Sequence, residues 1–227
     1  MAVEKGKCLK NLILLLKIAI CSLILVSCNG PSGGEPSSGM NKEQVRRLFH
    51  EVRRDFEANI RPKFSDRFPG EGLENCLLKL NKNDPNIDGG AIVGQIDITI
   101  PAIQLEETLR TFILYHEMGH VITVFQAQNL LLGNVVPGDR LKLFKKSEFL
   151  ADLIAVHLMD EGDRDRLVTT LRRNLQAILG PGDNMHPPGK DRVQRIVNYS
   201  NAIHGVVNDA QKEARFEQSF REMWNAL

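Results

Sequence analysis

Apolar residues recur at helical spacing in most of this chain, and they alternate with other residues in one short stretch. The first helical pattern covers residues 42–60, where one stripe holds Val45, Leu48, Phe49, Val52 and Phe56. Such a stripe is typical of a helix that packs one face on a core. Asn41 stands where an N-cap would lie. The same spacing predicts further helices over residues 105–126, 146–159 and 163–179, after Pro188, and over residues 209–224.

The alternating stretch lies directly before the second predicted helix. In residues 92–100, one side would hold Ile92, Gly94, Ile96, Ile98 and Ile100. This period of two, with many β-branched residues, predicts a strand that ends at Pro101. We expect irregular structure from Arg61 to Cys76, a turn over residues 84–90, and a loop or short hairpin over residues 129–144. The expected fold class is therefore α+β, with a small sheet and a mostly helical C-terminal part.

The first 27 residues differ from the rest of the chain. Lys5, Lys7 and Lys10 precede an apolar run that ends in "LVSC" at Cys28. This order indicates a secretory signal peptide over residues 1–27. The small residues before Cys28 resemble the bacterial lipobox, which implies that Cys28 becomes the lipidated first residue. A plain N-terminal membrane anchor with an incidental cysteine is the alternative.

The segment that follows predicts how the protein is held. Residues 28–41 are rich in Gly, Ser and Pro, which is typical of a flexible tether. Residues 42–227 then form the folded domain. We expect localisation in the cell envelope, with a lipid anchor in the membrane and the domain facing the periplasm or the exterior. Cys76 would be the one cysteine of the mature domain, so we expect no internal disulfide.

Composition narrows the class of protein. The chain is 42% hydrophobic and 25% charged, which is typical of a globular protein. Its formal net charge is +1, and no basic stripe stands out. We therefore expect no nucleic-acid partner.

The helix predicted over residues 105–126 carries the pattern HExxH, as His116-Glu117-Met118-Gly119-His120. Positions i and i+4 share one helix face, so both imidazoles could bind one metal ion. Glu117 would then serve as general base beside the open coordination position. Gly119 costs helix stability, and we expect it to mark the close approach of another element. The pattern alone also arises by chance, so a third ligand is needed.

The third ligand is expected on the next helix. Thr123 and Gln126 occupy the positions of the commonest extension of HExxH, which excludes a third histidine there. In "SEFLAD", Glu148 could reach the metal while Asp152 accepts a hydrogen bond from a ligand histidine. Ala151 is small and would let this helix lie close to Gly119. The alternative is an amphipathic helix whose acidic residues are merely solvated.

Together these residues resemble the gluzincin zinc metallopeptidases, in which HExxH is followed by ExxAD on a later helix. The resemblance spans about residues 91–196 and extends to bacterial lipoproteins with the same metallopeptidase layout. It implies a zincin-like fold, zinc bound by His116, His120 and Glu148, and Glu117 as general base in the hydrolysis of a peptide or protein substrate. It also implies that the strand before the zinc helix, here "VGQIDITIP", is an edge strand that pairs with substrate.

A second fragment, "HPPGKDR", is similar to the His-Pro…Arg element of CAAX-protease-like gluzincins. It implies catalytic roles for His186 and Arg192, and Tyr199 is a further candidate to stabilise the oxyanion. The sequence has no four-helix membrane region, unlike the intramembrane members. Two rival hypotheses remain. One is a catalytically silent zinc-binding envelope lipoprotein that acts as an interaction module, and the other is a helical lipoprotein with an accidental HExxH.

The lipid anchor can be tested directly. Labelled palmitate should appear in the full-length protein and be lost in Cys28→Ser, because the modified sulfur is then absent. Cys8→Ser is the control and should keep the label. An unlabelled, unprocessed wild-type protein would contradict the lipobox and support the plain membrane anchor.

Overall fold

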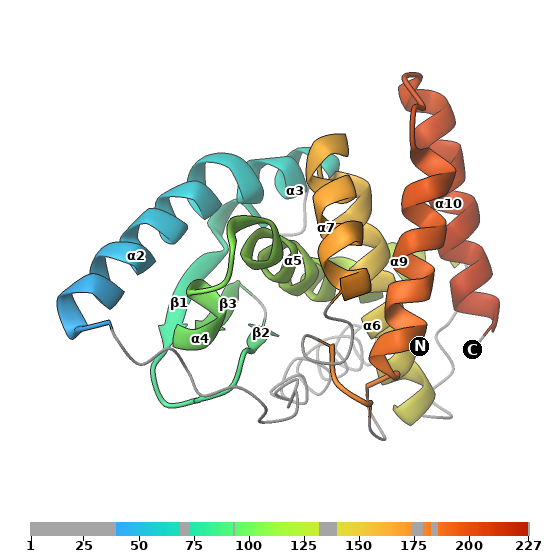
Figure 1. Cartoon of the computed structure of the whole chain (residues 1–227). Coiled ribbons are helices and arrows are strands. Elements are labelled where there is room, and N and C mark those ends of the chain that lie inside the picture. The colour runs from blue at the N-terminus through green and yellow to red at the C-terminus, as the bar shows by residue number, and fades with distance from the viewer. Residues whose placement is uncertain are drawn as a thin grey trace, which may run out of the picture.

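The structure is a computed structural model that describes residues 40–68, 73–92, 94–131, 140–173, 179–182 and 186–226. It combines a three-stranded sheet with helices that predominate in the C-terminal half (Figure 1). This arrangement agrees with the predicted α+β class. The predicted signal peptide, Cys28 and nearly all of the tether lie outside these residues. The elements of the first half are α2 (Lys42–Asp55), the π-helix η1 (Phe56–Ile60), α3 (Arg61–Arg67), the 3₁₀ turn η2 (Leu73–Asn75), β1 (Leu77–Asn81), β2 (Gly89–Ile92), β3 (Gln95–Thr99) and α4 (Ile100–Ile103). In the described part of the second half, the helices are α5 (Glu107–Leu131), α6 (Arg140–Leu158), α7 (Glu161–Arg173), α9 (Gly189–Ile203) and α10 (Asp209–Ala226).

Asn41 caps the first helix, as predicted. Its Oδ1 accepts hydrogen bonds from the backbone N–H groups of Glu43 and Gln44, both at 3.0 Å. The Gln44 side chain accepts in return from the Asn41 N–H at 2.7 Å, which completes a capping box. The helix continues through η1 into α3, so our expectation of irregular structure from Arg61 was wrong over Arg61–Arg67. Pro62 does not end it; it directly follows the wider turn of the π-helix η1, where the Arg61 N–H bonds to the Phe56 carbonyl.

The predicted single strand over residues 92–100 is in fact most of a hairpin. β2 pairs with β3 in antiparallel register, with Ala91 opposite Ile96 and Ile92 opposite Gln95. Gly94 lies in the turn and has a φ of 76°, a conformation that glycine adopts without strain. The alternation misled us because Gly94 falls on an apolar position and no Asn-Gly pair marks the turn. Ile96 and Ile98 are fully buried, and Pro101 lies in the first turn of α4.

The order of strands in the sheet is β1-β3-β2, with β1 parallel to β3. β3 is therefore the central strand, and our expectation that this stretch forms the edge of the sheet was wrong. The edge strand that contacts α5, the helix that carries the HExxH residues, is β2. β1 was not predicted, because residues 77–81 are too short and mixed in polarity to show a clear pattern.

Helices α5 and α6 form the most extensive helix pair among the described elements. They approach closely at Gly119, where an added Cβ would lie 2.9 Å from the Cα of Ala151 and 3.0 Å from its carbonyl oxygen. A normal side chain at residue 119 would therefore collide with backbone. The prediction that Gly119 and Ala151 mark a close helix contact is confirmed.

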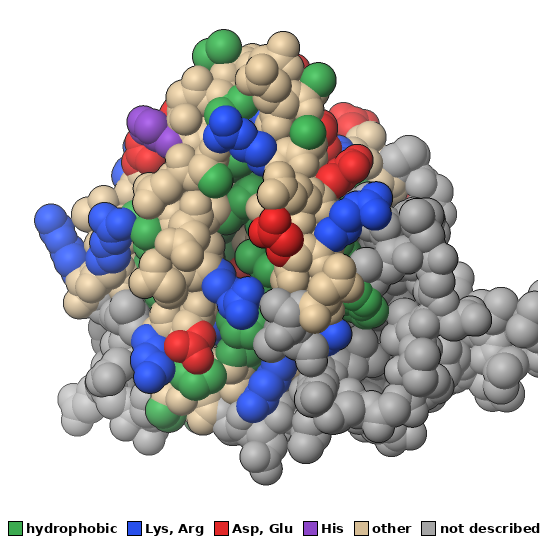
Figure 2. Space-filling view, turned by 90° about the vertical axis from the view of Figure 1, so that its right-hand side faces the viewer, with side chains coloured by type: hydrophobic (Ala, Val, Ile, Leu, Met, Phe, Trp, Pro, Cys, Tyr) green, Lys and Arg blue, Asp and Glu red, His purple; other side chains and the backbone are tan. Residues whose placement is uncertain are grey.

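The remaining helices pack around α6. Helices α9 and α10 contact it, and α7 contacts α9. All three were predicted: α9 begins directly after Pro188 and α10 begins at Asp209, as expected, whereas α7 begins earlier than predicted, at Glu161. In the part of the chain that the structure describes, no helix is long and apolar enough to cross a membrane. On the face shown in Figure 2, basic and acidic side chains are interspersed with hydrophobic ones, so the coloured part of that face carries both signs of charge.

The helix contact generates a stability prediction. Gly119→Ala should lower the free energy of unfolding by about 1–3 kcal/mol, because the overpacking against Ala151 outweighs the gain in helix propensity. Gly162→Ala in α7 is the matched control, since an added Cβ there meets no atom within 4 Å. Chemical denaturation measures both. Equal stability of the two variants would show that the helices can separate without cost.

Candidate metal centre

Two histidines on α5 and one glutamate on α6 meet in the interior. His116 and His120 lie one turn apart, and their Nε2 atoms are 2.9 Å from each other. Glu148 comes from the facing helix, with Oε1 3.2 Å from His120 Nε2 and Oε2 3.5 Å from His116 Nε2. All three residues are buried, and one ligand atom from each lies within 4.8 Å of the others. The predicted convergence of these side chains is confirmed.

This geometry fits a bound cation. Two imidazole nitrogens at 2.9 Å share at most one proton, and without a proton or a cation between them their lone pairs would repel. The buried Oε2 of Glu148 accepts no hydrogen bond of good geometry. Ligands of a tetrahedral zinc ion, each at about 2.0–2.1 Å, lie roughly 3.3 Å apart, close to the separations seen here. The three residues could therefore hold a metal ion.

Asp152 orients His116 from behind, as predicted. Its Oδ1 lies 2.9 Å from His116 Nδ1, one turn of α6 beyond Glu148. A carboxylate on the outer nitrogen keeps a proton there and leaves Nε2 free for a metal. Sequence spacing indicated this contact, because positions i and i+4 of one helix face the same way.

Arg192 on α9 binds both acidic residues of α6. Its Nε and Nη2 donate to the two carboxylate oxygens of Asp152 at 2.8 and 2.7 Å. Its Nη1 lies 3.1 Å from Glu148 Oε2. Such a bidentate pair fixes the carboxylate in one plane. The structure thus places Arg192 at the centre, as predicted, and shows it holding Asp152 and Glu148.

Ser147 contacts the other histidine, and sequence analysis missed this role. Its Oγ lies 3.0 Å from His120 Nδ1. Ser147 lies within α6 and contacts His120 on α5. Its position next to Glu148 was the signal that could have identified it. Both ligand histidines therefore have a partner on their outer nitrogen.

Glu117 lies beside the cluster and is only 3% exposed. Burial raises its pKa above the ordinary value, although the nearby His120 and His116 oppose this shift. The edge strand lies against its side chain, because a Cβ added to Gly89 would be 2.8 Å from both Cγ and Oε1 of Glu117. The residue predicted as general base is therefore held between α5 and β2.

Charge within the cluster is nearly balanced. Burial by itself would raise the pKa values of Glu148 and Asp152, but the Arg192 charge, joined at Glu148 by that of His120, holds both below their ordinary range. Burial likewise disfavours a charged His116, yet the hydrogen bond and charge of Asp152 outweigh it and raise the His116 pKa to about 10. The two carboxylates and the guanidinium together leave one negative charge, which the added proton on His116 offsets. A divalent cation could take the place of that proton.

The other candidates lie in different surroundings. His186 is buried shortly before α9, and its predicted role remains a prediction. The Tyr199 hydroxyl lies 2.8 Å from Nδ1 of His157, whose Nε2 contacts Glu213 at 2.9 Å. His157 is therefore a packed residue. Cys76 is buried, and burial raises its pKa to about 11.

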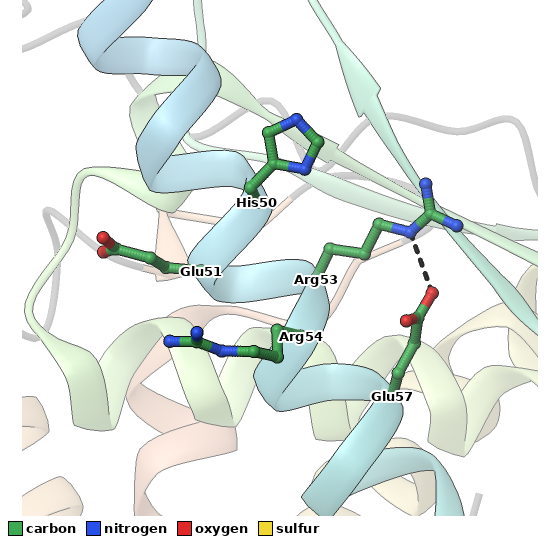
Figure 3. A pocket seen from close by; sticks show the side chains of 5 residues that line it. All are labelled: His50, Glu51, Arg53, Arg54 and Glu57. Carbon is green, nitrogen blue, oxygen red and sulfur yellow. Dashed lines mark hydrogen bonds and ion pairs between the residues drawn. The ribbon is translucent and has the colours of Figure 1, made fainter.

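His50 also lies apart from the metal centre. It lines a hollow on α2 together with Glu51, Arg53, Arg54 and Glu57 (Figure 3). All five residues come from successive turns of one continuous helical stretch, and Arg53 pairs with Glu57 at 2.8 Å. Basic and acidic groups alternate there, so the hollow offers no single charge to a ligand.

Comparison with protein-family models, curated proteins and solved structures finds no match for this chain. The case for a function therefore rests on the residues of this site.

The geometry predicts metal binding that depends on His120. The purified protein should contain about one equivalent of a divalent metal, and His120→Ala should lose it together with part of its stability, because a ligand is removed. His50→Ala is the control, since His50 lies on the surface of α2. Elemental analysis and thermal unfolding measure these effects. Equal metal content in the two variants would contradict the site.

Proposed function

We propose that this protein is a zinc-dependent peptidase of gluzincin type. The observation that supports it best is the meeting of His116, His120 and Glu148 beside Glu117, in the order and spacing of HExxH followed by ExxAD. Two imidazoles and one carboxylate are the ligand set of many catalytic zinc sites, and they leave a fourth position open. When bound, zinc would supply a Lewis acid that polarises a carbonyl and lowers the pKa of a coordinated water.

In this proposal, Glu117 moves the proton. It would accept a proton from the attacking water and deliver it to the amine that leaves when the peptide bond breaks. Its raised pKa, caused by burial, brings it nearer to neutral pH and suits a group that must both take and return a proton. His116 and His120 would keep their metal-facing nitrogens free because Asp152 and Ser147 contact the outer ones.

The oxyanion that forms from the peptide carbonyl needs a donor. Arg192 already donates to Asp152 and contacts Glu148, and Tyr199 contacts His157. These contacts favour Arg192 as a residue that positions the acidic pair, and Tyr199 as part of the packing around α6. His186 remains the candidate donor in our proposal.

The substrate would be a peptide segment in extended form. Because β3 is central, the strand available for pairing on the site's side is β2. β2 contacts α5, and its Gly89 touches Glu117. A peptide paired with β2 would thus pass close to the proposed base. We further propose that the anchor at Cys28 places this reaction at the envelope membrane.

The second candidate function is a protein that binds the metal but catalyses no reaction. His116, Glu117, His120 and Glu148 are all at least 93% buried. Such burial also suits a zinc site that only stabilises the fold, as in an envelope lipoprotein that acts as an interaction module. The two functions differ in what Glu117 does.

Glu117→Gln separates them. The amide keeps size and hydrogen bonding but cannot accept a proton, so zinc should stay and hydrolysis should fall by about 10²-fold or more. Zinc stoichiometry is measured beside cleavage of an unfolded protein such as casein. Glu51→Gln on α2 is the control and should keep full activity. A wild-type protein that binds zinc yet cleaves no substrate, with no effect of Glu117→Gln, would favour the silent module.

A further inference from the structure

Gly89, Gly90 and Gly119 differ in which atoms lie near a Cβ added at each position. At Gly119 an added Cβ meets backbone, and at Gly90 it meets nothing within 4 Å. At Gly89 it meets one side chain, that of Glu117, with Cγ and Oε1 at 2.8 Å and Cδ at 3.0 Å. Real Cβ atoms essentially never approach so closely, so the hydrogen of Gly89 is the only substituent that fits.

The contact matters because no hydrogen bond fixes this carboxylate. Among the residues that the structure describes, none forms a hydrogen bond with the Glu117 side chain, whereas His116 and His120 both have partners on their outer nitrogens. A general base must keep a defined position, and displacement by about 1 Å can cost on the order of 10²-fold in rate. Steric contact with the edge strand is one constraint on that position.

We propose that Gly89 is a positioning residue, which sets the place of the Glu117 carboxylate by lying against it from β2. The proposal rests on the proposed peptidase function for its catalytic consequence. The steric contact between the two residues does not depend on that function.

The backbone around Gly89 supports this role. The Gly89 N–H donates to its neighbour Asp88 at 2.9 Å, and Asp88 is itself buried. The Asp88 N–H donates to Thr99 Oγ1 at 3.1 Å, and the Thr99 N–H donates to the Asp88 carbonyl at 3.1 Å. Residue 89 is therefore tied to the central strand on one side and to Glu117 on the other. The start of β2 cannot move relative to β3 without disturbing these bonds.

A methyl group at residue 89 cannot be accommodated by turning the carboxylate alone. Cγ is only one bond beyond Cβ of Glu117, so the side chain must leave its rotamer or the strand must shift. If the Glu117 side chain leaves its rotamer, the proposed base moves while His116, His120 and Glu148 keep their places. The expected signature is thus a protein that keeps its zinc and loses its catalysis.

The experiment compares Gly89→Ala with Gly90→Ala, its neighbour on the same strand. Gly89→Ala should keep one zinc, lower the midpoint of thermal unfolding by several degrees, and lower kcat by about 10–100-fold with little change in KM. Gly90→Ala should match the wild type in zinc content and unfolding midpoint, and Gly162→Ala on α7, which lies outside the proposed site, should match it in hydrolysis. In a Glu117→Gln background, Gly89→Ala should cause no further loss of hydrolysis, because the base is already absent.

A second cycle tests the contact without any substrate. In a Glu117→Ala background the colliding atoms are gone, so Gly89→Ala should no longer lower the unfolding midpoint. If Gly89→Ala behaves like Gly90→Ala in stability and like Gly162→Ala in hydrolysis, the proposal is overturned. It is equally overturned if the loss of stability persists in Glu117→Ala. Suppose that the stability cycle shows coupling between residues 89 and 117, but the wild-type protein hydrolyses no peptide. The contact between the two residues would then be supported, and the proposed peptidase function would be wrong.

Discussion

The backbone contact between α5 and α6 at Gly119 and Ala151 determines how near the two helices can lie. Glu148 is three residues before Ala151, and His120 directly follows Gly119, so this contact also sets the distance between the ligands. A larger residue at either position would move the carboxylate away from the imidazoles. Glycine at residue 119 lowers helix stability by about 1 kcal/mol, and the close approach of α6 requires it.

A second layer of contacts turns this proximity into a defined site. Asp152, Ser147 and Arg192 bind the outer sides of the ligand residues, and they come from α6 and α9. Asp152 and Arg192 are buried, which is unfavourable for isolated charges and acceptable here because the two pair with each other. Helix α9 therefore has two roles. Its Arg192 holds Asp152 and Glu148, and its apolar face packs in the core.

The sheet contributes from the opposite side of α5. It is small, with three strands, and its hairpin brings Gly89 against Glu117. Its central strand buries Ile96 and Ile98, which ties the hairpin to the hydrophobic core. The proposed base therefore lies between a helix that carries it and a strand that limits where it can go.

The sequence by itself determined the local features of this protein. Helical periodicity placed His116 and His120 on one face and Glu148 and Asp152 on another, and the small residues Gly119 and Ala151 indicated the helix contact. These inferences succeed because spacing along one helix follows from its geometry. Only the tertiary structure decided that β3 is central, that Ser147 faces His120, that Arg192 holds two carboxylates, and that Gly89 touches Glu117. Each of these contacts joins residues from separate elements, and their partners depend on how whole elements pack, which no local pattern of residues records.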